Sequence, residues 1–107
     1  MSLLQQMQPA SSEQEILACI DRGLESVGCH TKNVVYWHLE RIGHISKSEI
    51  VDKPIKFVQG LRNLYRESSS GVENAILQQI NRRFNLNCSI GTDLVTAIFQ
   101  AKIKTPV

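Results

Sequence analysis

Histidine and cysteine are the side chains best suited to chemistry in this chain, and there are only three of each among its 107 residues. His38 lies within a helical pattern of apolar residues. A histidine there acts as a metal ligand or a pH switch, or as a core residue hydrogen-bonded to a carbonyl or carboxylate. No His or Cys stands three or four positions away, which favours the structural role.

The cysteines and the other histidines form no metal-ligand pattern. Cys29 and His30 make a single dipeptide with no second pair at a zinc spacing. His30 and His44 flank one helix roughly 20 Å apart at 1.5 Å per residue, too far to share an ion through it. An odd cysteine count without a secretory signal favours reduced thiols in a cytoplasm over a disulfide. The sequence therefore predicts no metal and no cofactor.

Catalytic motifs are equally scarce. The sequence contains no G-x-S-x-G elbow and no glycine-rich phosphate loop. The segment 68–71 could hold an anion at a helix N-terminus, but a capped, solvated turn is the simpler interpretation. We expect a protein that is not an enzyme; the alternative, an enzyme, would depend on His38.

Helix-start signals dominate the chain instead. The S-x-x-E capping box occurs at Ser12–Glu15, Ser46–Glu49 and Ser70–Glu73, each before an apolar helical pattern. Pro54 suits the first turn of a helix. The periodicity predicts helices over 12–27 and 32–42. It predicts a third helix from Pro54 to the polar turn 67–70, a fourth from that turn to 84, and a fifth over 93–102. A short helix is expected after Ser46.

The expected fold is therefore all-α, an irregular or orthogonal bundle of five main helices plus one short helix. Residues 1–11 are expected to be a flexible tail and 12–104 a single helical domain. The expected core residues are Leu17, Ile20, Leu24, Val35, Leu39, Ile42, Phe57, Leu61, Leu64, Ile76, Ile80, Phe84, Val95 and Ile98. Gly23, inside a helix, suggests close packing against a neighbour.

The helix over 32–42 carries the main interaction candidates. It has apolar residues on more than one side, which predicts the most enclosed element of the domain. Tyr36 and Trp37 point to opposite flanks of its main stripe. We predict that either, if exposed, contacts a protein partner. A leftover aromatic patch also predicts a homodimer through this helix.

An alternative interpretation concerns the segment 46–66, which loosely resembles a helix-turn-helix and would make the protein a nucleic-acid-binding transcriptional regulator. Its phosphate contacts would be Lys47, Lys53, Lys56, Arg62 and Arg66. Acidic residues are interleaved with them, and the net charge of the chain is only +2, so a solvated charged surface is favoured.

Charge and hydropathy set the remaining expectations. No apolar stretch approaches the ~18 residues of a membrane span, and the N-terminus lacks the basic and apolar regions of a signal peptide. A cytoplasmic protein that does not enter the membrane is expected.

The stretch from Lys32 to Leu86 resembles a small helical output-domain family. The residues that carry the resemblance are Val34-Val35-Tyr36-Trp37-His38-Leu39-Glu40, Ile50, Lys53-Pro54, Phe57, Leu61, Leu64-Tyr65, Gly71, Glu73 and Ile76-Leu77. That family occurs alone or appended to signalling and regulatory proteins of ammonia-oxidising archaea and their relatives. The resemblance implies an all-α module without catalytic residues that couples a signal to a partner.

Overall fold

The computed structural model describes residues 12–86 and 93–103, and these form an all-α protein. The α-helices are α2 (Ser12–Val27), α3 (Thr31–Arg41), α4 (Pro54–Tyr65), α5 (Ser69–Phe84) and α6 (Leu94–Ile103). Two 3₁₀ turns, η1 (Lys47–Glu49) and η2 (Arg66–Ser68), precede α4 and α5. No strand occurs within these ranges. The all-α class is therefore confirmed, whereas the expected tail over 1–11 lies outside the described residues.

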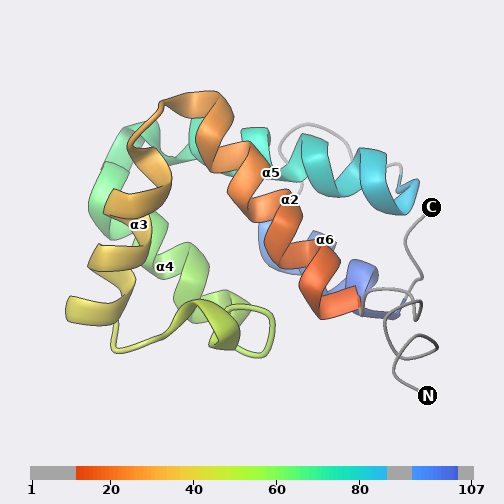
Figure 1. Ribbon diagram of the computed structural model, residues 1–107, viewed down its shortest axis with the longest axis horizontal. Coiled ribbons are helices and arrows are strands. Elements are labelled where there is room, and N and C mark those ends of the chain that lie inside the picture. The colour runs from red at the N-terminus through yellow and green to blue at the C-terminus, as the bar shows by residue number, and fades with distance from the viewer. Residues whose placement is uncertain (1–11, 87–92, 104–107) are drawn as a thin grey trace, which may run out of the picture.

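The closest helix pair is α2 and α5, which cross near the middle of the molecule (Figure 1). Gly23 of α2 is buried, and a Cβ atom placed on it would lie 2.7 Å from the Cα of Ile76. The close packing expected at Gly23 is confirmed. The expected core residues Ile76, Ile80 and Phe84 of α5 are confirmed as buried, and Val72 and Leu77 of the same helix are buried as well.

Helix α6 closes the core against α2, α4 and α5. Its buried side chains are Leu94, Ala97, Ile98 and Ala101. Phe99 is 49% exposed, although Leu94, Val95, Ile98 and Phe99 recur at helical spacing in the sequence. The two alanines take the inner face in its place, because small side chains let α6 approach its neighbours closely.

The connection from α3 to α4 follows the local signals in the sequence. The backbone N–H of Ser46 donates to the Glu49 carboxylate at 3.0 Å, forming the predicted capping box. Ile45 and Ile50, on either side of the box, are both buried. The short helix is a single 3₁₀ turn, and Pro54 begins α4 as expected.

Two helices begin slightly earlier than the sequence predicts, and neither has a side-chain cap. Helix α3 begins at Thr31 itself, and the preceding His30 makes no side-chain cap. Helix α5 begins at Ser69, one residue before the predicted box, again without a side-chain cap. Glu73 does not serve a box at Ser70, because its carboxylate forms an ion pair with Arg62 of α4 at 3.3 Å. A tertiary contact has replaced the local one.

The expected position of α3 is wrong. It lies at one side of the molecule, against α4 and one end of α2 (Figure 1), and only Val35 and Leu39 are buried on it. Ile42, expected in the core, is 59% exposed. The chain provides cover for one side of α3 only, so its remaining apolar side chains face solvent.

None of the helices in these ranges is long and apolar enough to cross a membrane.

Candidate interaction surface on α3

Three large apolar side chains stand exposed along α3. Val34 is 46% exposed, and Trp37 and Ile42 are each 59% exposed. Val34, Trp37 and Arg41 follow one another at spacings of three and four, so they share one helical face. Ile42, the residue after α3, lies four positions after His38 and therefore further round the helix, on the side of a hollow between α3 and α4. We refer to Val34, Trp37, Arg41 and Ile42 as the α3 surface. Grouped exposed apolar residues of this kind are typical of binding sites.

Trp37 is held in place by its own helix. The guanidinium carbon of Arg41 lies 5.6 Å from the centroid of the indole ring. This is the distance of a cation–π contact, worth about 0.5–1 kcal/mol at an exposed site. The contact covers part of the ring, yet the residue remains more than half exposed. Trp37 therefore presents an ordered aromatic surface to solvent.

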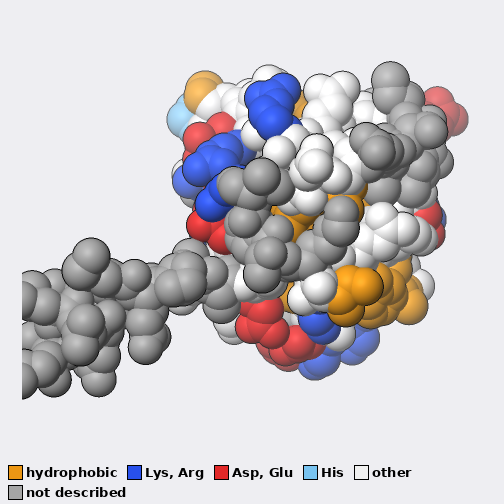
Figure 2. Space-filling model, turned by 90° about the vertical axis from the view of Figure 1, so that its right-hand side faces the viewer, with side chains coloured by type: hydrophobic (Ala, Val, Ile, Leu, Met, Phe, Trp, Pro, Cys, Tyr) orange, Lys and Arg blue, Asp and Glu red, His pale blue; other side chains and the backbone are white. Residues whose placement is uncertain are grey.

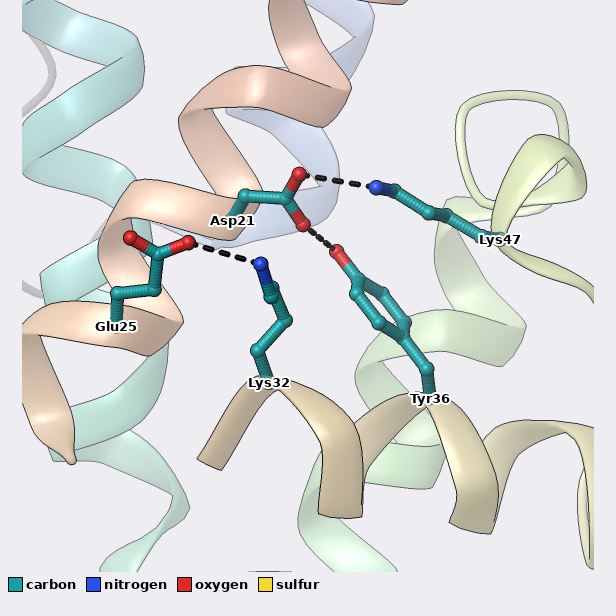
Figure 3. A network of polar contacts seen from close by, with 5 residues as sticks. All are labelled: Asp21, Glu25, Lys32, Tyr36 and Lys47. Atoms are coloured by element: carbon teal, nitrogen blue, oxygen red, sulfur yellow. Dashed lines mark hydrogen bonds and ion pairs between the residues drawn. The ribbon is translucent and has the colours of Figure 1, made fainter. Parts of the chain in front are cut away.

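Tyr36, the other aromatic candidate, is used inside the molecule. Its hydroxyl donates to Asp21 Oδ1 of α2 at 2.5 Å, and Lys47 Nζ donates to the second carboxylate oxygen at 2.9 Å (Figure 3). The same Lys47 Nζ lies 5.1 Å from the centroid of the Tyr36 ring. Lys32 of α3 adds an ion pair to Glu25 of α2 at 3.0 Å. This network fixes the inner side of α3 to α2 and η1.

The tyrosine environment favours the neutral phenol. Burial, and secondly the hydrogen bond to Asp21, raise the pKa of Tyr36 far above its usual range. The hydroxyl consequently remains a hydrogen-bond donor to Asp21 at all physiological pH values. This role is structural.

His38 lies on the other side of α3, towards α4. Its side chain is partly buried, and its Nε2 is shielded from solvent without a hydrogen-bond partner among the described residues. The hydrogen bond expected of a core histidine is thus absent at this nitrogen. His38 also lines a hollow of about 140 Å³ between α3 and α4, together with Ile42, Gly43, Lys56, Gln59, Gly60 and Asn63.

The basic residues of the segment 46–66 form no continuous basic face. Lys47 pairs with Asp21, Lys53 pairs with Glu49 at 2.7 Å, and Arg62 pairs with Glu73. Within the described chain, no ion pair involves Lys56 or Arg66. The first expected helix of the segment is only the turn η1. Figure 2, which views another side of the molecule, also shows basic and acidic side chains next to one another.

Neither of the two cysteines in the described part of the chain lines the hollow. Cys19 is buried in the core of α2, where its thiol donates to the Gln79 carbonyl at 3.6 Å and burial raises its pKa. Cys29 is exposed with a free thiol, and Cys88 lies outside the described residues. No group of three or more His, Cys, Asp or Glu side chains within 12–86 and 93–103 is placed to hold a metal ion.

A scan against protein-family models, a search of curated proteins and a search of solved structures find no match for this chain.

Trp37, a candidate from the sequence, is exposed, but the sequence does not reveal how α3 is anchored. The partner of Tyr36 is Asp21, 15 positions earlier on another helix, and no local pattern links the two. The sequence also does not reveal the hollow beside His38, because the walls of the hollow come from segments far apart in the chain. One signal was available: Lys56, Gln59 and Asn63 recur at helical spacing, which places three polar side chains on one face of α4.

Proposed function

We propose that this protein is a non-enzymatic interaction or signal-output module that binds a protein partner through the α3 surface. One observation carries the proposal. The only tryptophan of the chain is more than half exposed on a helix whose opposite side is fixed by Val35, Leu39 and the Tyr36–Asp21 bond.

The residue types on this surface support binding rather than incidental exposure. Tryptophan and arginine are the residues most enriched among those that dominate binding energy, and they act best when neighbouring contacts exclude water. Val34, one turn before Trp37, extends the apolar area next to the indole, and the Arg41 guanidinium already lies over the ring. Ordering the indole in advance reduces the entropy lost on binding.

The proposal includes two finer points from the sequence. One is the irregular bundle of five main helices plus a short one, which would present α3 from a rigid body. The other is the resemblance to archaeal output domains, in which a module of this kind couples a signal to a partner. A cytoplasmic location belongs to the same proposal.

Affinity capture with three baits tests the function. The wild-type chain, Trp37→Ala and Phe99→Ala are used on extracts of the cells from which the chain comes. Phe99 is a matched control, an exposed aromatic residue on α6. We expect a protein that is retained by the wild type and by Phe99→Ala and lost with Trp37→Ala. Equal recovery by all three baits, or substrate turnover without any partner, would overturn the proposal.

A homodimer would use the same apolar surface, with a second copy in place of the partner. The exposure of Trp37 and Ile42 favours the homodimer, because burying them against any apolar surface, including a second copy of the chain, removes them from water. Light scattering during size-exclusion chromatography tests it. A mass of twice the chain that falls to the monomer value in Trp37→Ala supports the dimer, and a monomeric wild type at high concentration excludes it.

A further inference from the structure

The hollow between α3 and α4 adjoins the α3 surface and differs from it in chemistry. Ile42 belongs to both. Beyond Ile42, the walls are formed by His38 and Gly43 on one side and by Lys56, Gln59, Gly60 and Asn63 of α4 on the other. A partner that covers Trp37 and Ile42 therefore meets a polar recess next to its apolar contact.

Gly60 of α4 lies where α3 and α4 contact one another. A Cβ atom on Gly60 would overlap Cδ2 of Leu39, a buried residue of α3, so the glycine leaves room for that side chain against α4. The hollow lies beside this core contact, between α4, His38 of α3 and the residues Ile42 and Gly43 that follow α3.

The size of the hollow indicates which kind of group can bind in it. Its volume of about 140 Å³ is well below the about 300–1,000 Å³ typical of pockets for small-molecule ligands and cofactors. A single side chain of a protein partner suits it better. The remainder of such a partner would lie on the α3 surface.

The charge of the lining residues indicates the charge of the group that binds in the hollow. Lys56 is a cation with no ion pair among the described residues. Gln59 and Asn63 carry amide N–H donors on the same face of α4, and none of the seven lining residues is a carboxylate. An ammonium group beside neutral donors favours an anionic occupant, because charge-assisted hydrogen bonds are the stronger ones.

We propose that the hollow binds the carboxylate of an Asp or Glu side chain from a protein partner whose neighbouring apolar residues cover Trp37 and Ile42. The inference rests on the proposed function and deepens it, since it specifies the partner segment as both apolar and acidic. Lys56 forms the ion pair, and Gln59 and Asn63 supply further donors. Trp37 and Ile42 contribute the apolar area.

Selection from a library of random displayed peptides tests the inference without knowledge of the natural partner. The wild-type chain is the bait, and Trp37→Ala is the subtraction control. We expect enriched peptides in which an acidic residue lies close to a large apolar one. Selection on Lys56→Glu should replace the acidic residue by Lys or Arg.

Affinity measurements on the enriched peptides complete the test. Fluorescence of Trp37, the only tryptophan, reports their binding. Lys56→Gln should weaken binding about tenfold or more, as expected for the loss of a charge-assisted hydrogen bond. Lys53→Gln is the matched control, because Lys53 lies outside the hollow and is already paired with Glu49; it should leave the affinity unchanged.

Two other results overturn the inference in distinguishable ways. Peptides that require Trp37 but lack acidic residues and tolerate Lys56→Gln would exclude the carboxylate site and leave the proposed function standing. A selection that enriches nothing on the wild type over Trp37→Ala would count against both.

Discussion

The guanidinium of Arg41 lies over the ring of Trp37, 5.6 Å from its centroid and one helical turn away on the outer face of α3. On the opposite face, Leu39 is 1% exposed and reaches Gly60 of α4. Two large side chains two positions apart thus serve different ends. Leu39 attaches α3 to the core, and Trp37 is left for a partner.

The first prediction follows from this division. Leu39→Ala should lower the free energy of unfolding by about 2–5 kcal/mol, because it removes buried methyl groups and leaves a cavity. Trp37→Ala should lower it by no more than about 1 kcal/mol, the value of an exposed cation–π contact. Urea denaturation followed by circular dichroism measures both. Equal losses would mean that Trp37 is a core residue.

The contact between α2 and α5 gives a second prediction. Gly23→Ala should destabilise the fold by about 1–3 kcal/mol, because the new methyl group meets the Ile76 backbone, which cannot move aside cheaply. Gly71→Ala is the control. Nothing lies within 4 Å of its Cβ position in α5, so it should stabilise the protein by about 0.5–1 kcal/mol. The same denaturation assay separates them, and a Gly23→Ala protein as stable as the wild type would refute the close approach.

The capping box at Ser46 predicts a pH dependence. The ammonium group of Lys53, and then the hydrogen bonds from Ser46, lower the pKa of Glu49 from 4.5 to about 2. The carboxylate therefore stabilises the folded state above about pH 4.5, and this contribution is lost as the pH falls towards 2.

The Glu49→Gln variant isolates this effect. Its denaturation midpoint should lie below that of the wild type near neutral pH, and the difference should narrow between about pH 4.5 and pH 2. Urea denaturation over this pH range provides the measurement. A difference that stays constant down to pH 2 would show that the Glu49 charge has no part in stability.

The nucleic-acid alternative yields a fourth prediction. Three of its five basic residues are already paired with acidic side chains of the same chain, so few are available to neutralise phosphates. We expect no shift of random duplex in a gel at about 50 mM salt and micromolar protein, a condition that favours non-specific binding. A shift that weakens steeply with added salt and is lost in Lys56→Gln with Arg66→Gln would restore the alternative.

Signals that act within a few residues of one another were readable in the sequence. Pro54 and the Ser46–Glu49 box mark the elements where they were expected, and Gly23 marks a close approach. The core residues Ile76, Ile80 and Phe84 of α5 were predicted correctly, because a single large core covers that side of the helix. The apolar stripe of a helix does not show whether another element of the fold packs against that stripe.

This limit explains the errors on α3 and α6. Ile42 and Phe99 follow the periodicity of buried positions, yet both are exposed. Whether these two side chains are buried depends on the positions of α4 and of the alanines of α6. Contacts between residues far apart in the sequence determine those positions. Trp37 and Tyr36 are equivalent candidates in the sequence, so the sequence does not show which of them is exposed. The hydrogen bond from Tyr36 to Asp21 of α2, seen only in the structure, separates the two.

Photo-cross-linking at position 34 tests the central claim most directly. A photoreactive phenylalanine replaces Val34, which is 46% exposed beside Trp37, so that Trp37 remains intact. The control carries the same group at Gln78, an exposed position on α5. After irradiation of the cells from which the chain comes, position 34 should yield a discrete covalent adduct with another protein, and position 78 should not. No adduct at 34, or the same adducts at both positions, would contradict a partner surface on α3.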